Sequence, residues 1–224
     1  VAALLCHSAL AQQHETFPVN GTYDQRDGLY AFTNATIYTN YNKKIEKATL
    51  LIQNGKVVQV GTAVTIPKNA VKIDLKGKFI YPAFIDIYSN YGLPETKSKE
   101  KRDGKPQMES DKKGAYGWNE AIRPETNANT LFDTNKKDAQ TLRDMGFAAV
   151  LTHLQDGIAR GSGTVVLLSD DAPQQCIIKG RATAHYSFNK GSSTQDYPES
   201  LMGSIALLRQ TYLDAKWYEQ SKGK

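Results

Sequence analysis

Residues 79–87 read Phe79-Ile-Tyr-Pro-Ala-Phe-Ile-Asp-Ile87, a nearly continuous apolar run. A strand that is apolar on both faces is typical of a parallel barrel or a doubly wound sheet, because other elements cover both of its faces. Pro82 fits near the start of such a strand, where an absent N–H group is tolerated. The run therefore predicts a strand buried on both sides and an α/β fold around it.

Upstream of this run, the pattern indicates a β-rich region. The segments 48–52 and 56–60 flank Asn54-Gly55, and this arrangement is typical of a hairpin with a type I′ turn. The segment 71–75 alternates apolar and polar residues, as a half-buried strand does. We therefore expect three strands between Tyr30 and Leu75, before the apolar run begins.

Downstream, the pattern alternates between helix and strand. Residues 138–145 form a short amphipathic segment, and Gly146 lies just past its end as a helix C-cap. The apolar segment 147–151 predicts a second buried strand, so strand, crossover helix and strand fit a βαβ unit. Two further short strands are expected at 164–168 and 176–178.

The longest helix is expected to open at Tyr197-Pro198, since proline suits the first helical turn. Its apolar residues recur at helical spacing and predict one buried face. These residues are Leu201, Ile205, Leu208 and Tyr212.

The N-terminal eleven residues are apolar and end in Ala9-Leu10-Ala11, which resembles the h-region and cleavage site of a secretory signal peptide. We therefore expect an exported protein, periplasmic or secreted. A buried N-terminal strand or helix, or lipid attachment at Cys6, is the alternative. No membrane span is expected, because the run is well short of the roughly 18 apolar residues that a span needs.

The charge distribution gives no indication of a nucleic-acid partner. The chain has 224 residues with 28 Lys plus Arg and 23 Asp plus Glu, so its net charge of +5 is a mild excess. Residues 95–113 hold seven basic and five acidic residues, and this mixture predicts a solvated loop. Cys6 and Cys176 are too few for a zinc knuckle or a disulfide framework.

Four motifs, in a fixed order and spacing, carry a resemblance to a known family. They are Asn34-Ala-Thr36, Ile52-Gln-Asn-Gly-Lys-Val-Val-Gln-Val-Gly61, Ile73-Asp-Leu-Lys-Gly-Lys78 and Tyr81-Pro-Ala-Phe-Ile-Asp-Ile-Tyr-Ser-Asn90. Together they resemble the opening of the metal-dependent amidohydrolase superfamily, in its imidazolonepropionase-like branch. Segments 146–151, 156–161 and 200–210 also look like a longer, secreted bacterial subgroup of these proteins.

The resemblance implies a small β-sandwich-type N-terminal region followed by the first part of an incomplete (β/α)8 barrel. The expected domains are a partial signal peptide (1–11), a linker (12–29), a β-rich composite region (30–78) and a partial barrel (79–224) with a charged loop (94–135). A complete barrel needs about 250 residues. We therefore expect open edge strands that a further segment of the same polypeptide covers.

In the family, the first barrel strand ends with two histidines separated by one residue, and both bind a divalent metal such as zinc in active members. The aligned residues here are Tyr88 and Asn90, and neither offers a neutral imidazole. The remaining family ligands come from later barrel strands. The resemblance therefore implies a degenerate motif, with no metal or cofactor bound by this segment.

Other residues are weaker site candidates. Asp86 precedes the degenerate motif, His153 follows the second buried strand, and His185 lies on an expected strand. A lone histidine at such a position is more often a hydrogen-bonded structural residue than a ligand. Asp156 and Arg160, with the glycines at 157, 161 and 163, suggest either a phosphate cradle or a structural turn, and the spacing favours the turn.

Two functions remain open from the sequence. The first is a hydrolase that acts on non-peptide C–N bonds, with a small amide-type substrate and with its chemistry beyond Lys224. The second is a pseudoenzyme or scaffold module that kept the fold and lost the metal. A sugar- or peptide-binding lipoprotein is a third and more distant alternative.

Overall fold

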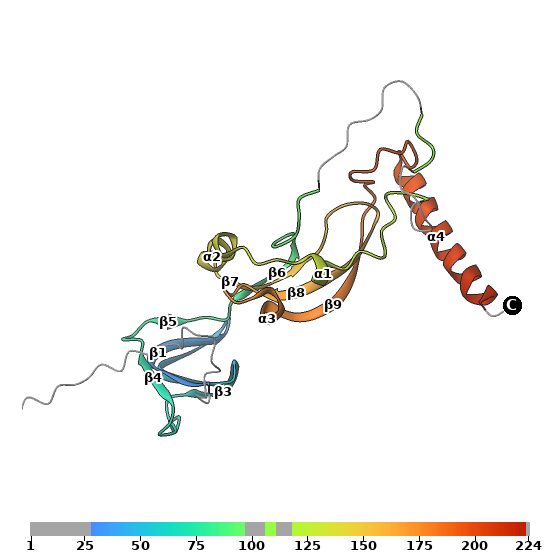
Figure 1. Ribbon diagram of the computed structural model, residues 1–224. Coiled ribbons are helices and arrows are strands. Elements are labelled where there is room, and N and C mark those ends of the chain that lie inside the picture. Colours follow the sequence, from blue (N-terminus) through green and yellow to red (C-terminus); the bar gives the residue numbers. More distant parts are fainter. Residues whose placement is uncertain (1–27, 97–105, 111–117, 223–224) are drawn as a thin grey trace, which may run out of the picture. The chain divides into compact units, whose positions relative to one another are not determined.

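The computed structural model describes residues 28–96, 106–110 and 118–222 (Figure 1). The expectations for residues 1–11, for nearly all of the linker and for much of the charged loop lie outside these ranges. Contacts group the chain into two compact units, which divide between Pro82 and Ala83. Each unit is described by itself.

The first unit is a five-stranded sheet. Its strands are β1 (Leu29–Asn40), β2 (Lys43–Gln53), β3 (Lys56–Gly61), β4 (Val71–Asp74) and β5 (Phe79–Ile80). The order is β3-β2-β1-β4, and β5 pairs with the later part of β1. Neighbours β1, β2 and β3 run antiparallel, whereas β4 and β5 lie parallel to β1.

The turns of this sheet follow from residues that adopt positive φ angles. Asn54 and Gly55 have φ of 50° and 73°, so the predicted type I′ hairpin between β2 and β3 is confirmed. Lys76 and Gly77 follow β4 in a turn, with φ of 50° and 82°. Small and branched side chains fill the interior, among them Ala31, Ala35, Ile37, Ala48 and Leu51.

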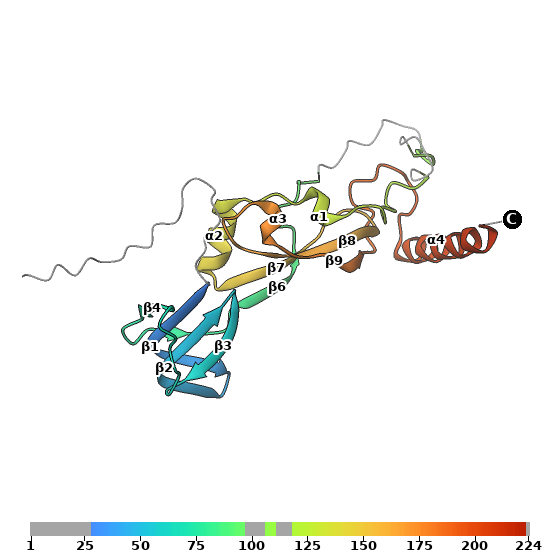
Figure 2. The same cartoon turned by 60° about the horizontal axis from the view of Figure 1, so that its bottom comes forward.

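The second unit contains a four-stranded sheet of order β6-β7-β8-β9 (Figure 2). Its strands are β6 (Phe84–Ser89), β7 (Phe147–Thr152), β8 (Ala159–Leu167) and β9 (Ile177–Tyr186). Its helices are α1 (Ala128–Leu131), α2 (Lys136–Asp144), α3 (Pro173–Cys176) and α4 (Leu201–Ser221). Strands β6 and β7 are parallel and α2 lies between them in sequence, which confirms the predicted βαβ unit.

Strands β8 and β9 run antiparallel to their neighbours. The segments that precede them, 153–158 and 168–176, are shorter than the dozen or so residues that a parallel crossover needs. The second sheet is therefore mixed, and only its first pair has the direction of barrel strands.

Helix α2 is held by caps at both ends. The side chain of Asn135 accepts hydrogen bonds from the backbone N–H groups of Lys137 (3.1 Å) and Asp138 (3.2 Å). Gly146, with φ of 94°, follows the helix and confirms the predicted C-terminal signal. These caps fix the helix next to β7, where Ala139 packs with Val150 in the main apolar cluster.

The apolar run 79–87 differs from the prediction of one strand buried on both faces. It is interrupted at residues 81–83, and Pro82 contributes no backbone donor there. Ile85 and Ile87 are 64% and 73% exposed, because no described segment of this unit covers their side chains, and β6 is also an edge strand of its sheet. The prediction of a strand was right, and the prediction of its burial was wrong.

The long helix also differs from its prediction. Helix α4 begins at Leu201, with the Ser200 hydroxyl accepting a hydrogen bond from the Gly203 N–H (3.0 Å), so Pro198 lies outside it. Its buried residues are Ser204 and Leu207, whereas Tyr212 is exposed. In the part of the chain that is described, no helix combines the length and apolar character of a membrane span.

Candidate functional site

The site candidates gather where β6 and β7 end, at the same edge of the second sheet. Asp86 and Tyr88 lie on β6 and Asn90 follows it directly. The two strands are parallel, and the His153 N–H donates to the Ser89 carbonyl (3.0 Å), which brings His153 beside the end of β6. The parallel pairing of the βαβ unit therefore collects residues that are more than 60 positions apart in the sequence.

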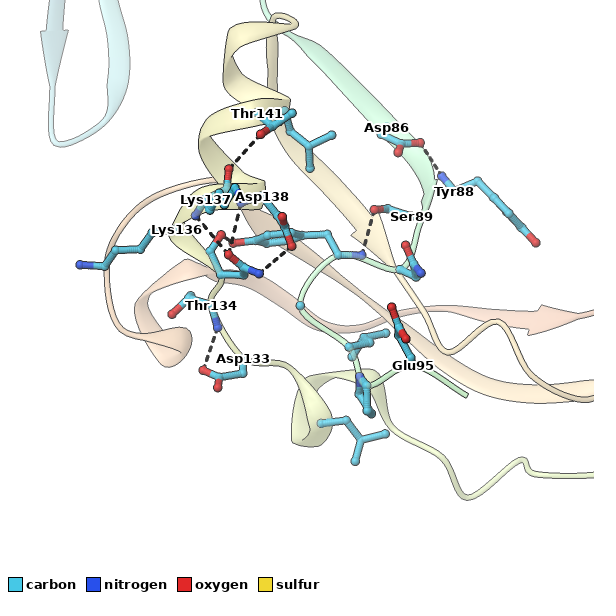
Figure 3. Close-up of a pocket in the computed structure, with 18 residues that line it drawn as sticks. Asp86, Tyr88, Ser89, Glu95, Asp133, Thr134, Lys136, Lys137, Asp138 and Thr141 are labelled. Atoms are coloured by element: carbon cyan, nitrogen blue, oxygen red, sulfur yellow. Dashed lines mark hydrogen bonds between the residues drawn. The ribbon is translucent and has the colours of Figure 1, made fainter. Parts of the chain in front are cut away.

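An open groove of about 1110 Å³ lies between the end of β6 and the start of α2 (Figure 3). Its charged lining residues are Asp86, Glu95, Asp133, Lys136, Lys137 and Asp138. Several of these carboxylates serve local structure. Asp86 accepts from the Tyr88 N–H (2.9 Å), Asp133 accepts from the Thr134 N–H (2.8 Å), and Asp138 accepts from the Asn135 amide (2.6 Å). The groove is polar, but these groups cap turns and a helix and do not converge on one point.

The side chain of Tyr88 extends away from α2 (Figure 3) and meets a histidine. Its ring lies edge-to-face against His153, with ring centroids 4.9 Å apart. On another side, His153 stacks on His185, with centroids 3.6 Å apart and the rings 4° from parallel. The structure therefore brings Tyr88, His153 and His185 together, and their sequence positions did not indicate this cluster.

Gly163 on β8 provides the room for the imidazole of His185. A Cβ atom at this residue would lie 2.5 Å from His185 Nε2 and 2.8 Å from Thr183 Oγ1. Those two side-chain atoms are themselves in hydrogen-bond contact at 2.6 Å. A side chain at position 163 would force the ring of His185 to move, so the glycine is part of the site.

Arg160, at the start of β8, completes the cluster. Its Nη1 donates to the Tyr88 hydroxyl (3.1 Å), and its Nε donates to the Gly157 carbonyl (3.1 Å). Burial, the neighbouring His185 and the Arg160 cation together lower the pKa of His153 from 6.5 to about 4. Burial and the same cation lower the pKa of His185. Both imidazoles are therefore neutral at pH 7, beside a fixed positive charge.

Asp156, which the sequence placed in a turn or a phosphate cradle, has a structural role. It forms a buried ion pair with Arg123, and it accepts from the N–H (2.6 Å) and the hydroxyl (2.7 Å) of Ser192. Gly157 and Gly161 have φ of 88° and 81°, as tight turns require. Asp156 and these glycines therefore form a turn that links three loops, whereas Arg160 and Gly163 belong to the strand-end cluster.

The residues of this cluster do not fit a divalent metal. Tyr88 accepts a hydrogen bond from a guanidinium, and a metal ion at the same oxygen would be repelled by that charge. The rings of His153 and His185 are stacked in nearly parallel planes, so their lone pairs, which lie in those planes, do not converge on one ion at the 2.0–2.1 Å of a zinc–nitrogen bond. Among residues 28–96, 106–110 and 118–222, no group of three His, Cys, Asp or Glu side chains is close enough to hold a metal ion.

Fold and site together define an α/β protein with a β-rich first unit and a βαβ unit whose strand ends carry the candidate residues. Residues 29–80 match the model of the NagA composite domain. The structure is similar to an amidohydrolase from Thermotoga maritima MSB8, with a TM-score of 0.59 and 26% sequence identity. The match covers 87% of this chain and 51% of that one, so the chain spans about half the length of this relative.

A second amidohydrolase structure matches 28% of this chain and 15% of its own length, with 27% identity and a TM-score of 0.26. No curated protein matches the chain significantly. The resemblance to the amidohydrolase superfamily is confirmed by the composite-domain match and by the T. maritima structure. The predicted fold class, with a β-rich region and the first part of a barrel, is confirmed by the same structural likeness.

The sequence did not indicate that Arg160 hydrogen-bonds to Tyr88, or that Gly163 leaves the space that the ring of His185 occupies. One signal was present, because strand alternation places Thr183 and His185 on the same face of β9. The pairing of Gly163 with Thr183 depends on the register of the β8–β9 hairpin, which contains irregularities that the sequence does not indicate.

Proposed function

We propose that this chain forms the N-terminal half of an amidohydrolase-like hydrolase that acts on non-peptide C–N bonds. The support is the likeness to the T. maritima amidohydrolase over 87% of this chain and about half of that protein. In active family members a divalent metal activates the water that attacks the substrate. Because the strand-end residues here do not fit that metal, its ligands would come from later strands of the longer polypeptide.

The observation that carries the site assignment is the contact between Tyr88 and Arg160. Tyr88 occupies the first position of the family's histidine pair, and a guanidinium lies against its oxygen. In this proposal the strand-end cluster touches a small amide-type ligand by hydrogen bonding and does not activate water. The same contact favours a second candidate, a pseudoenzyme module in which the whole protein has lost the metal.

An assay of the longer polypeptide separates the two candidates. Turnover of small amides and cyclic imides that a chelator abolishes would support the hydrolase, and its absence would support the pseudoenzyme. In an active enzyme, Tyr88→Phe combined with Asn90→Ala removes both aligned oxygen donors, and we expect kcat to fall less than about tenfold. A loss of a hundredfold or more, about 2.7 kcal/mol in the barrier, with folding intact would show that these residues take part in the chemistry.

We also propose that the protein is exported, on the basis of the apolar residues that end in Ala9-Leu10-Ala11. N-terminal sequencing of the protein from its native host tests this, and we expect the mature chain to begin near Gln12. Cytoplasmic protein that retains Val1 to Ala11 would contradict it.

A further inference from the structure

Arg160 is a half-buried cation with an unusual set of partners. Its guanidinium donates to a phenol and to a backbone carbonyl, and no carboxylate among the described residues pairs with it. The other half-buried arginines among the described residues of this unit differ. Arg123 pairs with Asp156, and Arg143 pairs with Asp170 at 3.1 Å. A partly desolvated guanidinium without an anion retains an attraction for one.

The two groups that accept hydrogen bonds from Arg160 are a hydroxyl and a backbone carbonyl, and neither carries a negative charge. Tyr88 is 57% exposed, so its hydroxyl and the guanidinium face solvent together. His153 and His185 are neutral. The ring of His153 packs against Tyr88, and the ring of His185 stacks on His153. Asp86, on the same strand as Tyr88, accepts a hydrogen bond from the backbone of Tyr88.

His153 is a second polar group of the cluster whose hydrogen-bonding capacity is unused. Its side chain is buried, with 1% of its surface exposed, and within the described part of the chain neither ring nitrogen has a hydrogen-bond partner. Buried polar groups are nearly always hydrogen-bonded, so the two ring nitrogens retain unused hydrogen-bonding capacity. The unsatisfied ring lies directly against Tyr88.

We infer that Arg160 and Tyr88 form an anion-binding site that takes the carboxylate group of a small molecule, at the strand ends where the family binds its metal. A carboxylate matches the planar fork of an arginine, and the Tyr88 hydroxyl is positioned to donate to one of its oxygens. A single guanidinium balances one negative charge, which favours a carboxylate over a doubly charged phosphate. The inference rests on this geometry and holds whether or not the longer protein hydrolyses an amide.

Ligand-observed NMR titration of the 224-residue chain tests the inference, because it reports on binding whatever the association state of the protein. The probe is N-acetylglycine, its uncharged control is N-acetylglycinamide, and inorganic phosphate is the third arm. We expect saturable binding of N-acetylglycine, and binding of the other two at least about tenfold weaker.

Variants assign the binding to residues. We expect Arg160→Gln to weaken N-acetylglycine binding about tenfold or more and Tyr88→Phe to weaken it several-fold. Arg181→Gln makes the same charge change at an exposed residue of β9 and is expected to leave binding unchanged. If Arg160→Gln does not fold, Arg160→Lys tests the same point, since it keeps the charge but loses the planar fork.

Three results would overturn the inference. The first is no saturable binding of N-acetylglycine by the wild-type chain. The second is equal affinity for the carboxylate and for its neutral amide or phosphate. The third is equal weakening by Arg160→Gln and Arg181→Gln, which would show a general effect of charge.

Discussion

Burial controls the ionisation of His153, which lies between the rings of Tyr88 and His185. The folded-state pKa of His153 is about 4, against 6.5 for an unperturbed histidine, and burial is the main cause. Between these two values the unfolded chain binds a proton that the folded chain rejects. The stabilising contribution of neutral His153 is therefore complete above about pH 6.5 and is lost as the pH falls toward 4.

We expect the free energy of unfolding to decrease by up to about 3 kcal/mol over this range through His153 alone. Urea unfolding at several values between pH 7 and pH 4.5 measures this. His153→Phe keeps an aromatic ring between Tyr88 and His185 but cannot titrate, so its pH slope should be clearly smaller. Equal slopes for the two proteins would contradict the assignment of the shift to His153.

At the scale of elements, the caps of α2 hold together the βαβ unit that positions the site. Asn135 accepts two backbone N–H groups at the start of the helix, and its own amide contacts Asp138. We expect Asn135→Ala to lower the stability of the chain by about 1 kcal/mol. Asn135→Ser, which keeps an accepting oxygen at the cap and adds no carboxylate beside Asp138, serves as the matched control and should lose much less. Equal losses in thermal or urea unfolding would show that capping is not the cause.

The elements that the sequence predicts well are those whose signals are local. The Asn54-Gly55 hairpin and the helix that ends before Gly146 follow from backbone preferences of a few neighbouring residues. The burial of β6 and of the face of α4 was predicted wrongly. A run of apolar residues indicates that a surface can be buried, but it does not show whether another segment covers that surface.

The candidate site was predictable only in part, for the same physical reason. Tyr88 and Asn90 follow from their alignment with a family motif, and His153 follows from its position after a buried strand. The contacts of Tyr88 with Arg160 and of His153 with His185 join separate strands. They depend on strand order and register, which no local pattern in the sequence specifies.

At the scale of the whole molecule, the exposed edge strand β6 is expected to control whether chains associate with one another. Its outward apolar residues include Phe84, Ile85 and Ile87, each more than 60% exposed. Exposed apolar edges promote association between chains. We therefore expect the 224-residue chain to self-associate, and Ile87→Lys to shift it toward monomer in sedimentation velocity. A wild-type chain that is monomeric and melts cooperatively would contradict this expectation.

The central claim is that the end of β6 is not a metal centre, although the sequence resemblance aligns it with the metal-binding strand of the family. The most direct test is elemental analysis of the 224-residue chain after incubation with excess zinc and extensive dialysis. The account predicts far less than one zinc ion per chain, both for the wild type and for Tyr88→His combined with Asn90→His, since the later family ligands come from other strands. One tightly held zinc ion per wild-type chain, lost on Tyr88→Phe or His153→Phe, would contradict it.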